Sequence, residues 1–254
     1  LRKNMVTECK SEVCNKCYEQ EESGFFSMRN SSNQTFGHHI KTIDDDEFKI
    51  RYYDIRFSNL CNLSCRSCGD VFSSNWVKEA KLMNWLPKDA PNVSYAGKTE
   101  TDAWEQLLPH IPHIEEVYFA GGEPLMMKEH YDLLHELLRQ GRTDVKLVYN
   151  TNFTELVFKG SSVLPLWNEF ECVSIGASLD ASHERAELMR KGTKWVQTVK
   201  NREEMLKVCP TVDFYVSSTL SIMNSFHIPD FHKEWVELGL LRPMDWNINI
   251  LQSP

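Results

Sequence analysis

The sequence predicts an α/β fold, a partial (β/α)6 TIM-like barrel preceded by a small cysteine-rich segment. From about residue 50 onward, short apolar runs alternate with longer amphipathic stretches, which is the pattern of strands joined by helical crossovers. Six such runs occur, and crossovers of this kind give a parallel sheet with right-handed connections. Before residue 50 the chain is polar and rich in cysteine. We therefore divide it into residues 1–49 and a barrel at 50–254.

The predicted strands and helices follow one another in regular order. Strands are predicted at 50–57, 115–120, 144–150, 171–179, 212–220 and 244–251. Helices are predicted near 73–85, 101–109, 128–140, 193–207 and 227–238, and 87–100 is predicted to be an insertion loop. In the helix at 128–140, Met127, Tyr131, Leu134 and Leu138 recur at helical spacing and should face the sheet.

Composition and charge exclude several classes of protein. The chain has 254 residues and a formal net charge of −8, which argues against broad electrostatic binding to nucleic acid. No run approaches the roughly 18 apolar residues that a membrane span needs, and the N-terminus shows no secretory signal pattern. We therefore expect a cytoplasmic protein without a membrane partner. The chain begins at Leu1 and stops after the last predicted strand, so residues are expected to be missing at both ends.

Eight cysteines are many for a chain of this size, and six of them fall in two tight clusters. One alternative is a secreted disulfide protein, which the five Asn-x-Ser/Thr triplets would suit. A second alternative is a set of scattered core thiols. Tight clusters in a barrel-sized chain without a signal peptide favour metal binding over both.

The second cluster consists of Cys61, Cys65 and Cys68, directly after the first predicted strand. Thiolates are soft ligands that suit iron–sulfur clusters and zinc. Three thiolates on a cubane cluster leave one iron open for another ligand, unlike a four-thiolate electron-transfer cluster. The alternative is a zinc knuckle whose fourth ligand lies elsewhere in the chain.

The C-x3-C-x2-C spacing after the first strand resembles the signature of the radical S-adenosylmethionine (SAM) superfamily. The resemblance implies a [4Fe–4S] cluster whose open iron binds the amino and carboxylate groups of SAM. It also implies an electron donor such as flavodoxin or ferredoxin. One electron then cleaves SAM to methionine and a 5′-deoxyadenosyl radical, which abstracts hydrogen from the substrate.

Further residues match the same family pattern. The resemblance implies that a GGE motif receives the SAM amino group, that an S-x-D…R pattern holds its carboxylate, and that two asparagines lie nearby. These residues are Gly121, Gly122, Glu123, Asn152, Ser178, Asp180, Arg190 and Asn224. One departure is Ser67, where the family usually has a bulky residue beside adenine, and Trp76 is a candidate to compensate.

The first cluster, Cys14 and Cys17 with Cys9 nearby, resembles the SPASM/Twitch-type auxiliary modules of some radical SAM enzymes. The resemblance implies a second iron–sulfur cluster, while the spacing alone suits a structural zinc equally well. Free thiols in a loop are a further alternative. The fourth ligand is open and could be His38 or a residue upstream of Leu1. Residues 23–49 are predicted to be a linker.

The function that follows is a radical SAM enzyme acting on a peptide or protein. One alternative is the oxidation or rearrangement of a small metabolite such as a sugar or aminocyclitol. Another is a zinc-binding interaction protein without catalysis. The sequence assigns no residue to the hydrogen-abstraction step itself.

Overall fold

The computed structural model describes residues 10–42, 49–99 and 101–251 of the chain. It divides the chain into two compact units, Leu1–Lys49 and Ile50–Pro254. Each unit is described by itself.

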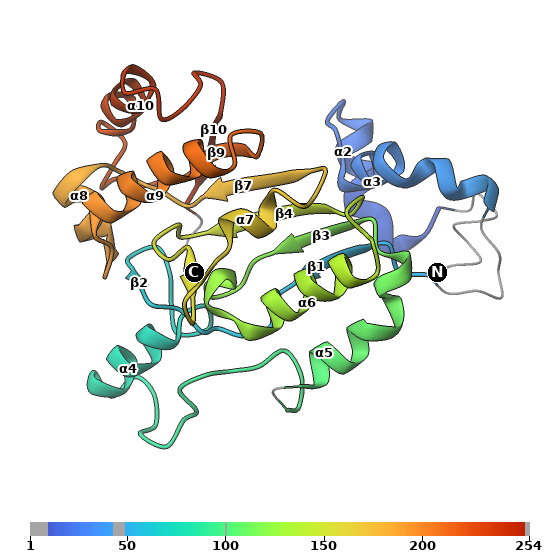
Figure 1. Ribbon diagram of the computed structural model, residues 1–254, viewed down its shortest axis with the longest axis horizontal. Coiled ribbons are helices and arrows are strands. Elements are labelled where there is room, and N and C mark those ends of the chain that lie inside the picture. The colour runs from blue at the N-terminus through green and yellow to red at the C-terminus, as the bar shows by residue number, and fades with distance from the viewer. Residues whose placement is uncertain (1–9, 43–48, 100, 252–254) are drawn as a thin grey trace. The chain divides into compact units, whose positions relative to one another are not determined.

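The second unit is built on a parallel sheet of six strands (Figure 1). The strands are β1 Tyr52–Ile55, β3 Glu116–Phe119, β4 Lys146–Thr151, β7 Val173–Ala177, β9 Asp213–Leu220 and β10 Trp246–Ile250. They lie side by side in chain order, and every neighbouring pair is parallel. The predicted α/β fold with a partial barrel is confirmed, and each strand lies where a strand is predicted.

Helices make the crossovers between successive strands. They are α4 Ser74–Leu82, α5 Asp102–Leu107, η3 Leu108–His113, η4 Pro124–Met126, α6 Lys128–Arg139, α7 Leu164–Trp167, α8 His183–Met189, α9 Trp195–Val208 and α10 Ile228–Glu237. The five predicted helices correspond to α4, α5, α6, α9 and α10. The short helices α7 and α8 are not predicted, because four and seven residues are too few to show a helical period.

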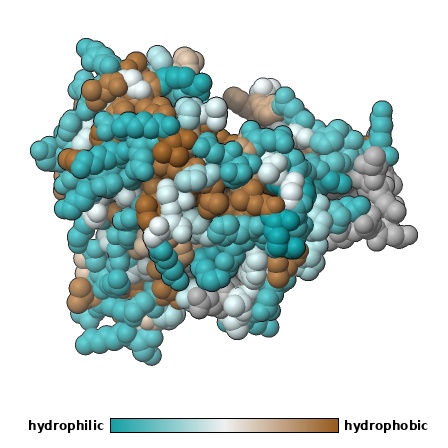
Figure 2. Space-filling view, in the orientation of Figure 1, coloured by the Kyte–Doolittle hydropathy of each residue, from teal (hydrophilic) through white to brown (hydrophobic). Residues whose placement is uncertain are grey.

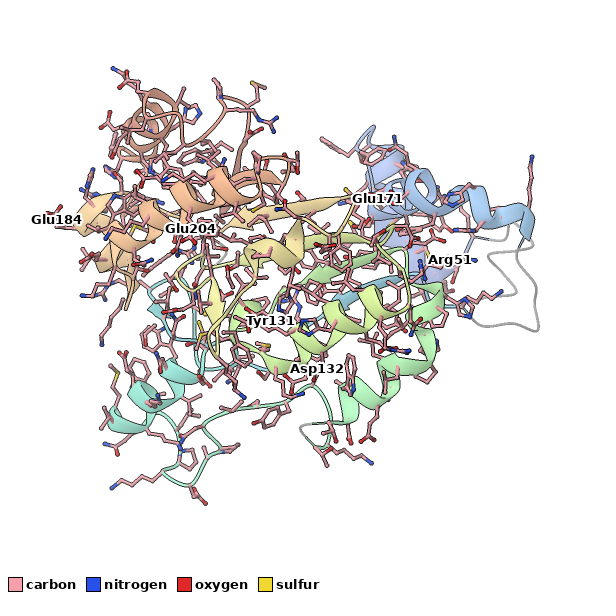
Figure 3. All side chains as sticks on the ribbon, viewed as in Figure 1. Arg51, Tyr131, Asp132, Glu171, Glu184 and Glu204 are labelled. Carbon is pink, nitrogen blue, oxygen red and sulfur yellow. The ribbon has the colours of Figure 1, made fainter. Side chains whose placement is uncertain are left out.

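Helix α6 shows how the helices cover the sheet. Leu133, Leu134 and Leu137 are fully buried in the core, and each such leucine contributes about 1.5–3 kcal/mol. Figure 3 labels Tyr131 and Asp132 on this helix. The Tyr131 hydroxyl donates to the Leu125 carbonyl over 3.1 Å, whereas Asp132 pairs with Lys128. The predicted apolar stripe is confirmed.

The two faces of the sheet differ in polarity. Along β3, buried Val117 and Phe119 alternate with half-exposed Glu116 and Tyr118. The same alternation runs along β4 and β9, so the face away from the core is largely polar. On the outer surface seen in Figure 2, the helices are mostly hydrophilic, with hydrophobic residues showing in patches between them. Within the described residues, no helix combines the length and apolar character that crossing a membrane requires.

Two small antiparallel pairs lie outside the main sheet. Strand β2 Ser64–Cys65 pairs with β8 Arg190–Lys191, and β5 Val157–Phe158 pairs with β6 Ser161–Ser162. The β2–β8 pair joins the cysteine loop after β1 to the turn after α8. Strands of two residues leave no readable alternation, so the sequence does not predict them.

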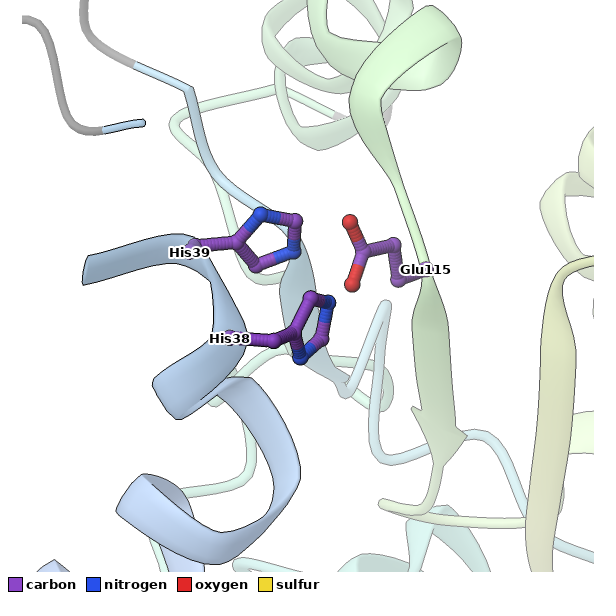
Figure 4. A group of neighbouring side chains, drawn as sticks. All are labelled: His38, His39 and Glu115. Carbon is purple, nitrogen blue, oxygen red and sulfur yellow. The ribbon is translucent and has the colours of Figure 1, made fainter. Parts of the chain in front are cut away.

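The first unit contains η1 Glu12–Cys14, α2 Asn15–Glu22, α3 Met28–Phe36 and η2 Gly37–Thr42. The prediction of a linker from residue 23 is wrong, because a helix of nine residues lies inside it. Ser27 caps this helix by accepting a hydrogen bond from the Asn30 amide. Between Met28 and Phe36 at its two ends the helix is entirely polar, so it lacks the apolar period that would predict it. On η2, the rings of His38 and His39 lie with their centroids 3.9 Å apart (Figure 4).

Candidate metal and cofactor site

The three cysteines after β1 line one cavity of about 300 Å³, which we call the site cavity. It lies where β1, β3, β4 and β7 end, since residues that follow each of these strands contribute to its wall. Cys61 and Cys65 are 9% and 8% exposed. The predicted ligands therefore meet in one place, at the carboxyl edge of the sheet.

The cysteine loop is wrapped around the first turn of α4. The Ser74 hydroxyl accepts from the Cys61 amide and also donates to the Cys61 carbonyl, over 3.1 and 3.2 Å. The Ser73 hydroxyl donates to the Leu63 carbonyl over 2.6 Å, and Leu63 is fully buried beneath the loop. These contacts fix the backbone that carries the thiols.

The spacing of the three sulfurs does not suit a single tetrahedral ion. Ligands of one tetrahedral zinc, each about 2.3 Å from the metal, stand about 3.8 Å apart. The sulfurs of Cys61, Cys65 and Cys68 do not all lie within 4.8 Å of one another. Thiolates that each bind a different iron of a cubane stand farther apart than ligands of one ion. The three thiols as they stand therefore do not form the ligand set of one tetrahedral ion, and as soft donors they are chemically suited to an iron–sulfur cluster.

Burial governs the protonation of these thiols. It raises the pKa of Cys61 to about 11, and it also raises the pKa values of Cys65 and Cys68. The thiols are therefore protonated near neutral pH unless a cation is close to them. Binding of an iron–sulfur cluster would release these protons.

Gly121 and Gly122 line the site cavity beside the cysteine loop. A Cβ on Gly122 would lie 2.2 Å from the Leu60 carbonyl oxygen, and Gly121 has a φ of +105°. The backbone here runs directly against the loop, with the Gly122 amide donating to the Ser58 carbonyl over 3.1 Å. Only glycine fits this close approach.

Glu123 does not line the site cavity, unlike the two glycines before it. It is fully buried, and its carboxylate accepts hydrogen bonds from the Thr151 hydroxyl and the Asn152 amide, both over 2.7 Å, and from the Leu125 amide. Burial raises its pKa to about 7 against these hydrogen bonds. Through these hydrogen bonds Glu123 links the ends of β3 and β4, and it lies behind the residues that line the site cavity.

Of the S-x-D…R pattern, Ser178 and Arg190 line the site cavity and Asp180 does not. Asp180 is buried behind Arg190, with 2.8 Å between the Arg190 Nε and the Asp180 Oδ2. The Asp180 carboxylate raises the pKa of Arg190 against the opposing effect of burial. The Arg190 Nη1 also donates to the Cys65 sulfur over 3.7 Å.

The two predicted asparagines have different surroundings. Asn152 lines the site cavity, and its amide nitrogen donates to the Asn62 side chain over 2.8 Å and to the Cys61 sulfur over 3.8 Å. Asn224 does not line it. Its amide nitrogen donates to the Asp180 and Thr219 carbonyls, both over 2.9 Å, so its side chain holds the turn after β9.

The cavity wall also contains residues that the sequence does not predict. They are Arg56, Phe72, Tyr118 and Asn150. Phe72 lines the site cavity beside the cysteine loop, whereas Trp76 does not line it and donates its indole N–H to the Cys65 carbonyl over 2.7 Å. Period-two alternation could have placed Tyr118 and Asn150 on the polar face of the sheet, but it could not have shown that they reach the cavity.

In the first unit, Cys14 ends η1 and Cys17 lies on α2, both partly exposed. The other motif residues lie close by, since Arg29 and Ser27 both donate to Glu21. Within this unit no described group of three close ligand atoms includes either cysteine. Cys9 lies outside the described residues. The seven described cysteines are all free thiols.

An ion pair lies at the opposite edge of the sheet from the site cavity. Glu115, drawn in Figure 4, directly precedes β3 and forms an ion pair with Arg51. Arg51, labelled in Figure 3, directly precedes β1. The pair therefore joins the starts of these neighbouring strands, away from the carboxyl edge where the site cavity lies.

The chain matches no protein-family model and no curated protein. It does match solved structures. A histidine-tagged form of anSMEcpe with bound AdoMet is 20% identical, with a TM-score of 0.56, over 82% of this chain and 51% of that one. Streptococcus suis SuiB bound to S-adenosylmethionine is 14% identical, with a TM-score of 0.55, over 94% and 51%. SuiB bound to the precursor peptide SuiA is 15% identical, with a TM-score of 0.53, over 95% and 52%.

These identities show a shared fold, and the chain spans about half the length of the structures it matches. Both neighbours are radical SAM enzymes. The resemblance predicted from the motifs is therefore confirmed at the level of the fold.

Proposed function

We propose that this chain is a radical SAM enzyme, with residues 50–254 as its catalytic barrel. One observation carries the proposal: three thiols share a cavity with Arg190 and Gly121 at the carboxyl edge of the sheet. A [4Fe–4S] cluster supplies, when bound, the electron that cleaves SAM to methionine and a radical able to abstract hydrogen. The electron would come from a donor such as flavodoxin or ferredoxin.

In this proposal the residues of the chain bind the cluster and orient SAM. Cys61, Cys65 and Cys68 hold the cluster. Arg190, oriented by Asp180, offers its guanidinium to the methionine carboxylate of SAM, since arginine matches carboxylate geometry. Gly121 and Gly122 bring backbone carbonyls close to the methionine amino group.

The proposed substrate is a peptide or protein. Its support is that SuiB binds the precursor peptide SuiA and that anSMEcpe binds the Cp18Cys peptide. The alternative substrate is a sugar or another small metabolite. Residues 1–49 are proposed as an auxiliary metal-binding segment, on the motif of Cys14 and Cys17.

The test is anaerobic reconstitution with iron and sulfide, followed by addition of SAM and dithionite. The wild-type chain should gain absorption near 400 nm and form 5′-deoxyadenosine. The variant with Cys61, Cys65 and Cys68 all changed to Ala should form none and lose about four irons per chain. Cys172→Ala is the control, because Cys172 is exposed and lies outside the site cavity. A triple variant that still forms 5′-deoxyadenosine would refute the proposal.

A further inference from the structure

Arg56 stands at the junction between the site cavity and a second cavity. The second one, which we call the side cavity, has a volume of about 200 Å³. The two share Arg56, Phe72, Gly121 and Gly122 in their walls. A molecule that extends from one cavity into the other passes this guanidinium.

The Arg56 side chain is only partly used by the protein. Its Nε and Nη2 donate to the two oxygens of Asp54, over 2.9 and 3.1 Å, in a bidentate pair. Its Nη1 has no partner among the described residues. The pair thus presents one strong donor with almost no net charge, because the Asp54 carboxylate balances the guanidinium.

Tyr118 adds a second donor to the floor of the site cavity. Its hydroxyl oxygen accepts a hydrogen bond from the Asn150 side-chain amide, which leaves the hydroxyl hydrogen available. Burial raises the pKa of Tyr118, so the phenol stays protonated. Arg56 and Tyr118 are close enough for the guanidinium charge to lower that pKa slightly.

Space for the Tyr118–Asn150 pair depends on Gly176 in the next strand, which is the registered partner of Asn150. A Cβ on Gly176 would lie 2.8 Å from the Asn150 Oδ1 and 2.7 Å from the Tyr215 hydroxyl. The absence of a side chain at this glycine thus leaves room for neighbouring polar side chains on the polar face of the sheet, the face away from the core.

Part of the side-cavity wall is made of apolar side chains that meet solvent, beside exposed Arg56 and Ser94. Val71, Phe72 and Tyr95 line it, and all three are exposed. Two donors in one cavity, without net charge and next to exposed apolar side chains, suit a neutral acceptor attached to an apolar group. An amide carbonyl beside an apolar side chain has this chemistry.

We infer that Arg56 and Tyr118 bind a backbone amide carbonyl of a peptide substrate, with a neighbouring apolar side chain in the side cavity. The inference rests on the proposed function and adds to it the part of the substrate that is recognised. Both residues position the substrate, and neither takes part in cleaving SAM.

The experiment measures binding of N-acetylated, C-amidated tripeptides with a central Leu, Phe or Cys to the reconstituted enzyme with SAM, by calorimetry without turnover. At least one should bind. Arg56→Met should weaken its affinity by about tenfold or more, and Tyr118→Phe by about three- to tenfold. Tyr53→Phe is the matched control on the neighbouring strand β1, because the Tyr53 hydroxyl has no hydrogen-bond partner among the described residues and does not line the site cavity.

Asp54→Asn makes the test specific to charge balance. It leaves the Arg56 charge unbalanced, so tripeptides with a free C-terminal carboxylate should gain affinity relative to the amidated ones. A purely structural role for Asp54 would weaken both kinds of tripeptide equally.

Two outcomes would overturn the inference. One is unchanged affinity in Arg56→Met and Tyr118→Phe, and the other is an enzyme that cleaves SAM but binds none of the tripeptides. Dithionite-driven SAM cleavage is measured separately, so failure of the proposed function is seen in that assay alone.

Discussion

Cys65 and Arg190 are registered partners in the two-stranded β2–β8 sheet, although 125 residues separate them in the chain. The main chain therefore sets the distance between one thiol and the guanidinium, before any ligand is considered. Asp180 then holds the Arg190 side chain from behind. A metal ligand and a carboxylate-binding group are thus positioned by the same short structure.

Arg190→Lys tests this arrangement while keeping the positive charge. Lysine cannot contact both Asp180 and a carboxylate in the fork geometry of arginine, so SAM affinity should fall about tenfold or more. The iron content should stay at the wild-type value. Equilibrium binding of SAM and iron analysis on the same preparation check both. Lys191→Arg is the matched control, because Lys191 points to the surface and pairs with Glu79. Unchanged SAM affinity in Arg190→Lys would remove Arg190 from the site.

Gly122→Ala should damage the cysteine loop from outside it. The new Cβ would lie 2.2 Å from the Leu60 oxygen, which is a backbone atom and cannot move alone. We expect a loss of stability of about 1–3 kcal/mol and a reduced iron content after reconstitution. Gly69→Ala is the control in the same region, because a Cβ there meets no atom within 4 Å. Equal stability of the two variants, measured by urea unfolding, would contradict the close approach.

His130 should make the stability of the chain depend on pH in the acidic range. Burial lowers its pKa to about 3, and its Nε2 lies 2.9 Å from the Tyr149 hydroxyl. The unfolded chain binds a proton at this residue below about pH 6.5, and the folded chain does not until about pH 3. Stability should therefore fall as the pH is lowered through this window, by about 1.4 kcal/mol per pH unit at most.

Urea unfolding at several pH values, compared between variants, isolates this contribution. His130→Gln cannot titrate, so its loss of stability between pH 6.5 and pH 4 should be smaller than that of the wild type. His135→Gln removes an exposed histidine on the same helix whose charge also lowers the His130 pKa, so its pH profile should lie between those of the wild type and His130→Gln. Identical pH profiles for wild type and His130→Gln would show that His130 is not buried as a neutral group.

The second metal site is tested by counting metals in the full chain. If Cys14 and Cys17 hold a cluster, anaerobic preparations should contain about eight irons, and if they hold zinc, about four irons and one zinc. The double variant Cys14→Ala and Cys17→Ala should lose the additional metal and keep the rest. About four irons and no zinc in the wild type would leave these thiols without a metal.

The sequence predicts the strands because each carries a dense apolar run, and it predicts Cys61, Cys65 and Cys68 because their spacing is local. It does not predict what depends on distant contacts. The pairing of Cys65 with Arg190 joins segments 125 residues apart in the chain, and Arg56 lines the cavity together with residues that follow three other strands. Asn224 differs, since its side chain is used by hydrogen bonds to the turn after β9 and to the Asp180 carbonyl and does not line the site cavity.

Glu123 and Asn152 give the site a further property. The Asn152 backbone amide donates to Glu123, and the Asn152 side chain donates to Asn62 in the cysteine loop. Segments from three strand ends thus share one chain of hydrogen bonds. Only the link between Asn62 and Asn152 joins two side chains, so substitutions at these two positions should not act independently: once one is lost, loss of the other should cost less than it does alone. Natural variation at Asn62 is therefore expected to be accompanied by a change at Asn152.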